Sequence, residues 1–174
     1  MLSTTVHDAN MLIDQVDERD RPIGSIVRSQ VFRLKANFRV SHVLVFDKFG
    51  RLLIQQLART RERNPLRWGS SVASYVPAGI TYADAARERM LQELGITEVP
   101  LEPFGKVTMI DEGCTKFISV FKAVYEGELR IDQNHIAETR WVTLLNLMEM
   151  PLSGDSLTPT FRHVISALLS RGAE

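Results

Sequence analysis

The stretch 81–96 constrains the fold of this chain more than any other part. It reads Thr-Tyr-Ala-Asp-Ala-Ala-Arg-Glu-Arg-Met-Leu-Gln-Glu-Leu-Gly-Ile. Thr81 can accept a hydrogen bond from the first turn of a helix, and Asp84 stands three residues later, as in a capping box. Gly95 can adopt the left-handed conformation that ends a helix. The stretch therefore predicts one helix with a defined start and a defined end.

Apolar, β-rich runs lie on both sides of this helix, and short turns separate them. Two hairpins are expected from Leu12–Val16 with Pro22–Val27 and from 40–46 with 51–57. Later strands are expected at 68–77, 107–111, 116–125 and 139–142, and shorter helices at 29–34, 144–148 and 158–170. This order predicts an α+β fold, an α/β/α sandwich with a mixed sheet between helices. One domain over 1–174 is expected, with 1–10 as a flexible N-terminal segment.

Composition excludes several classes of function. The chain has 21 basic and 21 acidic residues, so it lacks the positive charge that general nucleic-acid binding needs. No apolar run approaches the roughly 18 residues of a membrane-spanning helix. Residues 1–10 do not have the pattern of a signal peptide. Cys114 is the single cysteine, which suits a reducing cytoplasm, and a buried or turn position is expected for it.

The end of the predicted helix, Gln92-Glu93-Leu94-Gly95-Ile96, resembles the end of a Nudix box. That box runs Gly, five residues, Glu, seven residues, then Arg-Glu-apolar-any-Glu-Glu-any-Gly-apolar. In this chain its positions fall on Ser74, Ile80, Glu88, Arg89, Met90, Gln92, Glu93, Gly95 and Ile96. Only Met90, Glu93, Gly95 and Ile96 fit the pattern. The resemblance therefore implies a Nudix-like fold with a degenerate box.

Four further segments resemble the isopentenyl-diphosphate-isomerase-like branch of the Nudix superfamily. They are the hairpin at 16–24, the second hairpin at 46–54, Pro65-Leu66-Arg67-Trp68 and Glu138-Thr139-Arg140-Trp141-Val142. The third of these resembles a Pro-Gly-any-Trp motif of that branch. With the box, the resemblance covers about residues 12–170, nearly the whole chain.

The box normally supplies three carboxylates at positions 89, 92 and 93, which share one helix face. Such oxygens hold Mg²⁺ or Mn²⁺ jointly with substrate phosphates. Here the positions are Arg89, Gln92 and Glu93, and Glu88 points about 140° away from Glu93. Two interpretations of Arg89 and Glu93 stay open. One is an ordinary ion pair on the helix surface; the other comes from the isomerase-like branch.

In that branch the residue matching Arg89 is an arginine that contacts the substrate diphosphate, and the residue matching Glu93 binds Mg²⁺. Arg28 and Arg61 also fall at basic diphosphate contacts, whereas another such contact is Leu57 here. The resemblance therefore implies a phosphate clamp of Arg89, Arg61 and Arg28, with Glu93 as catalytic residue and metal ligand. The basic loop 59–67 meets phosphate or is simply solvated.

The isomerase chemistry itself is not expected. The position of the catalytic cysteine is Ala73, and that of a metal-binding histidine is Tyr75. The remaining metal-binding positions of the isomerases fall on Phe32, Arg39, Cys114 and Lys116. Proton transfer to and from an alkene needs a positioned acid and base.

Asp111, Glu112 and Glu138 are the other acidic candidates for a relocated metal site, although turn or surface positions are the simpler expectation. The favoured function is Mg²⁺- or Mn²⁺-dependent hydrolysis of a phosphoanhydride such as a nucleoside diphosphate derivative. The alternative is a catalytically inactive domain that binds a nucleotide, a diphosphate ligand or a protein partner. No membrane partner is expected, and the N-terminal hairpin is a candidate homodimer contact.

Overall fold

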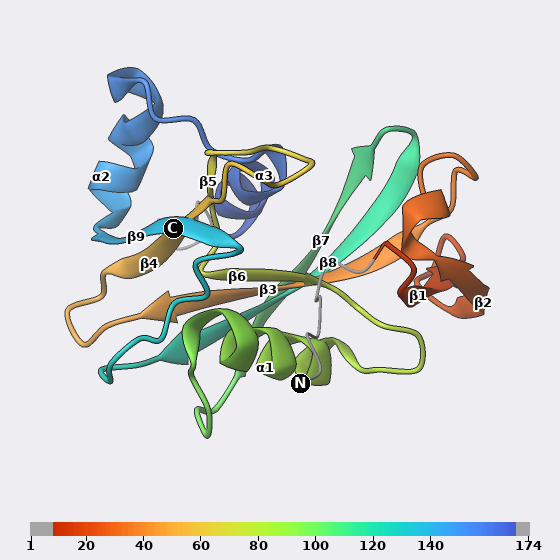
Figure 1. Ribbon diagram of the computed structural model, residues 1–174, viewed down its shortest axis with the longest axis horizontal. Coiled ribbons are helices and arrows are strands. Elements are labelled where there is room, and N and C mark those ends of the chain that lie inside the picture. The colour runs from red at the N-terminus through yellow and green to blue at the C-terminus, as the bar shows by residue number, and fades with distance from the viewer. Residues whose placement is uncertain (1–8, 170–174) are drawn as a thin grey trace.

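The computed structural model describes residues 9–169, and Figure 1 shows a mixed sheet between helices. The strands are β1 (Leu12–Val16), β2 (Pro22–Val27), β3 (Phe38–Phe46), β4 (Leu52–Leu57), β5 (Trp68–Gly69), β6 (Val72–Tyr75), β7 (Glu102–Asp111), β8 (Cys114–Val124) and β9 (Ile136–Val142). The helices are α1 (Tyr82–Leu94), α2 (Leu144–Glu149) and α3 (Pro159–Leu168), with 3₁₀ turns η1 (Arg28–Gln30) and η2 (Met150–Ser153). The predicted α/β/α sandwich is confirmed.

Alternate residues of the central strands face opposite layers. On β3, Val43 and Val45 pack with Met90 and Leu94 of α1, whereas Leu44 belongs to the cluster that contains Phe161 of α3. Figure 1 shows α1 on one side of the sheet and α3 on the other. Each large apolar side chain buried in this way contributes about 1.5–3 kcal/mol to the free energy of unfolding.

The sheet divides between β3 and β4. Of these two strands only Phe46 and Leu52, beside the hairpin turn, are paired. Beyond that point β6 pairs with β3, while β5 and β9 pair with β4. Ser71 lies between β5 and β6 and joins the two branches, because its Oγ donates to Leu53 O and accepts a hydrogen bond from Val45 N at 2.9 Å. The sheet therefore has a fork in its centre.

The predicted ends of α1 are confirmed. Thr81 accepts a hydrogen bond from Asp84 N at 3.1 Å, and Gly95 has a φ of 70°. A Cβ at Gly95 would lie 2.8 Å from Arg130 Cβ, so both the conformation and the space favour glycine. These two caps fix where α1 begins and ends, and with it the positions of Met90 and Glu93 relative to the fork.

The remaining elements agree with their predicted order. The segment expected to be a helix at 29–34 is only the short turn η1 followed by further turns, and α3 ends at Leu168. Residues 1–8 and 170–174 lie outside the described range. Ala9 belongs to the segment expected to be flexible, but its carbonyl accepts a hydrogen bond from Ser29 N at 3.0 Å. Among residues 9–169 no helix is long and apolar enough to cross a membrane.

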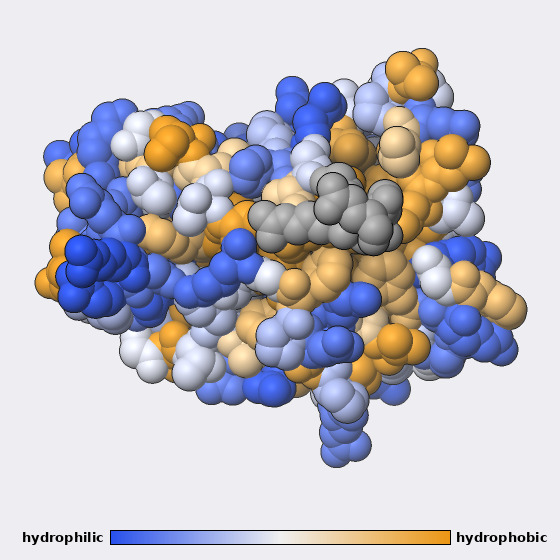
Figure 2. Space-filling model, turned by 180° about the vertical axis from the view of Figure 1, so that it is seen from behind, coloured by the Kyte–Doolittle hydropathy of each residue, from blue (hydrophilic) through white to orange (hydrophobic). Residues whose placement is uncertain are grey.

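Apolar side chains reach the surface where α2 and η2 meet. The exposed group consists of Leu144, Leu145, Met148 and Leu152. In Figure 2 this end of the molecule lies at the upper right, where orange atoms gather. These residues form the outer face of α2 and η2, while Leu147 and Met150 turn inward to the core.

A network around Asp20 fixes the N-terminal hairpin to the sheet. The Asp20 carboxylate binds Arg39 Nε at 2.6 Å, Lys106 Nζ at 2.6 Å and the Tyr82 hydroxyl at 2.8 Å. Burial alone would raise the pKa of Asp20, but these hydrogen bonds outweigh it and hold the pKa below its usual value. The ionised carboxylate therefore connects the β1–β2 turn with β3, β7 and α1.

Asp20→Asn is expected to lower the free energy of unfolding at pH 7 by about 2–4 kcal/mol, because it removes the charge from a largely buried network. Asparagine tolerates the φ of 62° at this position, so the backbone is preserved. A depressed folded-state pKa contributes its full stabilisation above the unfolded pKa of about 4 and loses it as pH falls through the folded pKa, so the difference should shrink below pH 4. Urea unfolding across pH would measure it.

Glu102→Gln, at an exposed position on β7, is the matched control and should change stability by less than about 0.5 kcal/mol. A deficit of Asp20→Asn that stays constant from pH 7 to pH 3 would contradict the ionic interpretation of the network.

Candidate functional site

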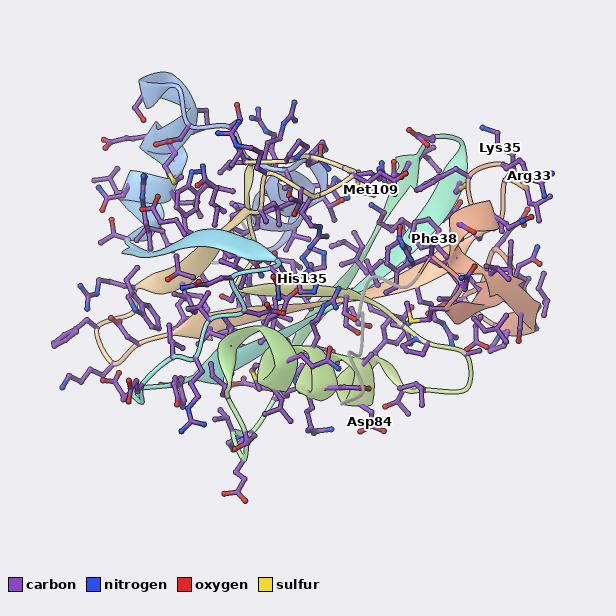
Figure 3. The ribbon with its side chains drawn as sticks, viewed as in Figure 1. Arg33, Lys35, Phe38, Asp84, Met109 and His135 are labelled. Carbon is purple, nitrogen blue, oxygen red and sulfur yellow. The ribbon has the colours of Figure 1, made fainter. Side chains whose placement is uncertain are left out.

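A cavity of about 380 Å³ occupies the fork of the sheet. Its walls come from β3, β4, the β5–β6 connection, the loop 59–67, α1, the turn before β9 and the start of α3. In Figure 3, Phe38 and His135, which both border the cavity, lie well apart along the sheet, while Asp84 lies on the outer side of α1. The fork thus lets groups from both faces of the sheet meet in one space.

The floor of this cavity contains a buried ion pair. Arg89 Nε lies 3.1 Å from Glu93 Oε1, and each side chain is only 2% exposed. Arg89 Nε also donates to Ala73 O at 3.3 Å. The other carboxylate oxygen, Glu93 Oε2, accepts from Gln55 Nε2 at 3.0 Å, and the same amide donates to Ser71 O at 2.8 Å. Both oxygens of Glu93 are therefore engaged by protein groups.

Arg61 and Arg28 border the same cavity. The Arg61 backbone N donates to Ala58 O, just after β4, at 3.1 Å, and its guanidinium interacts electrostatically with Glu93 and with Arg28. The Arg28 guanidinium lies 5.2 Å from the centre of the Tyr75 ring. Burial lowers the pKa of Arg89 to about 10; Glu93 opposes this, and the charges of Arg61 and Arg28 add to it. Burial likewise lowers the pKa of Arg61. At neutral pH three guanidiniums therefore border the cavity that holds the Arg89–Glu93 pair.

A second group of charges lies on the α3 side of the cavity. Lys116 Nζ binds Asp111 Oδ2 at 2.6 Å and donates to Thr160 Oγ1 at 2.9 Å. Arg63 binds the same carboxylate through two nitrogens, at 2.8 and 3.1 Å. Burial lowers the pKa of Lys116, whereas Arg63 and Lys116 together hold the pKa of Asp111 below its usual value despite burial. The charges of this group, two cations and one carboxylate, balance one another more nearly than the charges on the cavity floor do.

His42 and Ser70 form a buried polar pair between these two groups. His42 Nδ1 lies 2.7 Å from Ser70 Oγ, and both residues border the cavity. Burial and the nearby charge of Lys116 lower the pKa of His42 to about 3. The imidazole is therefore uncharged at neutral pH.

Comparison with known proteins identifies the family. The NUDIX domain model matches residues 36–161. The chain belongs to the Nudix family. An uncharacterized Nudix hydrolase of Pseudomonas aeruginosa is 31% identical over 150 residues, covering 84% of this chain and 89% of that protein. Isopentenyl-diphosphate Delta-isomerase 2 of Photorhabdus laumondii is 26% identical over 159 residues, covering 88% of this chain and 89% of the isomerase.

Solved structures show the same fold. A Deinococcus radiodurans protein superposes with a TM-score of 0.81 at 21% identity, covering 90% of this chain and 98% of that one. The NUDIX domain of Shewanella oneidensis NrtR, complexed with ADP ribose, gives a TM-score of 0.61 at 12% identity, covering 75% and 85%. At these identities the likeness establishes the architecture of this Nudix protein and no more.

The structure brings the predicted clamp residues to one cavity. Arg89, Arg61, Arg28 and Glu93 all border it. The interpretation of Arg89 and Glu93 as a surface ion pair is wrong, because both side chains are buried against the fork. Gln92 does not border the cavity, and its Nε2 lies 3.5 Å from Glu88 Oε1.

The other acidic candidates for a metal site do not border the cavity that holds Glu93. Asp111 binds Arg63 and Lys116, and Glu112 occupies the β7–β8 turn with a φ of 49°. Glu138 is exposed on β9 and binds Arg140 Nε at 3.0 Å. Cys114 is buried, as expected, with its Sγ 3.6 Å from Val31 O. Trp68 is in the core, and the partly buried Trp141 packs against the apolar cluster on the α1 side of the sheet.

Sequence reasoning missed Gln55, His42 and Ser70 as parts of the site. Each is a polar residue in or beside an apolar strand, and that interruption is the only signal that the sequence offers. In 40–46, His42 stands on the same face as Val40 and Leu44, a face that is otherwise apolar. A polar residue buried there requires a partner, which Ser70 supplies.

The donor set does not fit a metal site built from protein ligands alone. Within residues 9–169 no three His, Cys, Asp or Glu residues are grouped so that they can hold an ion. Glu93 is engaged by Arg89 and Gln55, and Asp111 by Arg63 and Lys116. The predicted roles of Glu93, Asp111, Glu112 and Glu138 as metal ligands therefore stay predictions.

The energetic coupling of Arg89 and Glu93 can be measured by a double-mutant cycle. Glu93→Gln should lower the free energy of unfolding by about 3–5 kcal/mol, since it leaves the Arg89 charge buried beside those of Arg61 and Arg28. Arg89→Met should cost less, since the charge of Arg61 still acts on Glu93. The double variant should lose clearly less than the sum, because it leaves neither charge. Urea unfolding would measure all four proteins; additive losses would contradict the direct pair.

Proposed function

We propose that the cavity binds the diphosphate of a nucleotide-derived phosphoanhydride. The observation that supports this most is that Arg28, Arg61 and Arg89 border one cavity, where Arg89 and Glu93 form a buried ion pair. Guanidinium groups match the geometry of phosphate oxygens and form charge-assisted hydrogen bonds with them. A diphosphate would supply the negative charge that Glu93 alone does not provide.

The size and surroundings of the cavity agree with such a ligand. A volume of about 380 Å³ lies within the range of small-molecule sites, and its walls combine apolar and polar groups. A structural neighbour, the NUDIX domain of Shewanella oneidensis NrtR, is complexed with ADP ribose, a nucleotide-derived diphosphate. That ligand is therefore a suitable probe for this chain.

Family membership makes hydrolysis of the bound anhydride the reaction to propose. Nudix hydrolases generally use divalent metal ions, and Glu93 is the acidic residue of the box that remains, so we assign it the catalytic role. The second candidate is binding without turnover. It is favoured by the hydrogen bonds from Arg89 and Gln55, which occupy both oxygens of Glu93.

Diphosphate binding is tested by calorimetric titration of pyrophosphate and ADP ribose in the presence of EDTA. Arg61→Gln and Arg28→Gln should each raise the Kd for both ligands about 10-fold or more, because each removes a charge-assisted contact. Arg87→Gln, on the outer face of α1, is the matched control and should leave both Kd values unchanged. Equal Kd values for all four proteins would contradict the proposed clamp.

Hydrolysis is tested by measuring phosphate release from nucleoside diphosphate compounds with Mg²⁺ and with Mn²⁺. Glu93→Gln should lower the rate about 100-fold or more if Glu93 acts in the reaction. Glu88→Gln, an exposed change on the same helix, should stay within about twofold. Tight ligand binding by the wild-type protein without any turnover would exclude hydrolysis of these compounds and support the second candidate.

A further inference from the structure

The outer side of α2 and η2 exposes a group of apolar side chains that take no part in the cavity. Leu145 is 65% exposed, Met148 71% and Leu152 88%, and Leu144 is exposed with them. Isolated apolar side chains are common on protein surfaces, whereas a group on one short stretch of chain marks an interaction surface. We call these four residues the apolar face.

The β3–β4 turn places an aromatic ring at the same end of the molecule. Leu52 at the start of β4 pairs with Val142, which lies just before α2, so the turn and the start of α2 are neighbours (Figure 1). Phe49 in this turn is 72% exposed. The Asp47 carboxylate accepts hydrogen bonds from Phe49 N at 2.9 Å and from Arg51 N at 2.8 Å, and it binds Arg51 Nε at 2.6 Å. The turn is therefore braced by its own hydrogen bonds and extends the apolar face with an exposed ring.

One cation and one carboxylate at the edges of this surface have no ion-pair partner within residues 9–169. Lys48 is exposed in the turn, with its ammonium 5.1 Å from the centre of the Phe49 ring. Glu126 binds the backbone N of Lys48 and not its ammonium. Glu149 is exposed at the end of α2, one helical turn after Leu145. The surface thus carries one charge of each sign that no opposite charge neutralises, with apolar side chains between them.

We propose that the apolar face, together with Phe49, Lys48 and Glu149, is a two-fold interface between two copies of this chain. In such an interface the same surface of both copies meets, so each contact between two different residues occurs twice. A two-fold axis through the apolar face brings Lys48 of each copy to Glu149 of the other, while the leucines pack together at the centre.

Charge complementarity favours a second copy over other occupants. A surface with charges of only one sign would repel its own copy, whereas this one carries a cation and a carboxylate on opposite sides of the axis. An anionic occupant, such as an acidic peptide or an anionic lipid surface, would pair with Lys48 but meet repulsion from Glu149. A second copy satisfies both charges and buries the apolar face.

Sedimentation equilibrium of the full-length chain tests the interface. Wild-type protein should dimerise with a Kd of roughly 10–100 μM, as expected for a small interface. Leu145→Asp should raise this Kd about 100-fold or more, because it places a charge at the apolar centre; the side chain is exposed in the monomer, so the fold is retained. Wild-type protein that remains monomeric at about 500 μM would overturn the proposal.

Ile23→Asp is the matched control. Ile23 is 62% exposed on β2, in the N-terminal hairpin, and its replacement should leave the dimer Kd within about twofold. A dimer that Ile23→Asp dissociates and Leu145→Asp leaves intact would overturn the assignment and move the interface to the hairpin.

Charge reversal tests the pairing between copies. Lys48→Glu and Glu149→Lys should each raise the dimer Kd about 10-fold or more, because symmetry creates two like-charged pairs in each dimer. In an equimolar mixture of the two variants, both pairs across a heterodimer are again of opposite charge, so its Kd should return to within about threefold of the wild-type value. A mixture that dimerises no better than its separate components would overturn the proposed pairing.

Discussion

The separation of β3 from β4 is the constraint on which the rest of the structure depends. Neighbouring strands of a continuous sheet lie about 4.8 Å apart, and their side chains cannot pass from one face to the other. Here the two strands pair only at Phe46 and Leu52, and the edges opened between them are occupied by β6 on β3 and by β5 on β4, while β9 pairs with the outer edge of β4. Ser71 satisfies backbone groups of both branches at the point of division. At this fork α1, through Arg89 and Glu93, and α3, through Thr160, contribute groups to the same cavity.

Burial of charge at the fork follows from this geometry. An i, i+4 pair on an exposed helix face contributes only about 0.3–0.5 kcal/mol. Under the fork the Arg89–Glu93 pair is removed from water, and desolvation offsets much of its attraction. This chain nevertheless places the pair here, with two further arginines nearby, although apolar residues could pack at the same place with a smaller desolvation penalty. By contrast, the Asp20 network lies away from the cavity and joins four elements, so its stabilising role needs no ligand to explain it.

The sequence predicts local features well and long-range ones poorly, for identifiable reasons. Thr81 and Gly95 act within their own helix, so the ends of α1 could be predicted. The fork could not, because apolar runs predict that two strands form a hairpin but not where their pairing stops. Burial of Arg89 and Glu93 could not be predicted either, since their spacing is the same on an exposed helix and on a buried one. Arg63 binds a partner 48 residues away, and spacing in the sequence carries no signal for that contact.

One departure from the isomerase-like pattern shows how the arginine-bearing loop is held. Leu66 stands where that branch has glycine, and its φ of 60° lies in the left-handed region. Such a conformation costs a residue with a Cβ roughly 1–2 kcal/mol.

The cost is offset by hydrogen bonds at the end of β4. Leu66 N and Arg67 O bond the two backbone groups of Leu57, each at 2.9 Å, and Gln56 Nε2 donates to Leu66 O at 3.1 Å. The loop that presents Arg61 and Arg63 to the cavity is therefore fixed by backbone bonds to the same strand that supplies Gln55. One strand thus donates to Glu93 through the Gln55 amide and holds the end of the loop that carries Arg61. Because the backbone of β4 fixes the end of this loop, the loop keeps a strained leucine without displacing its arginines.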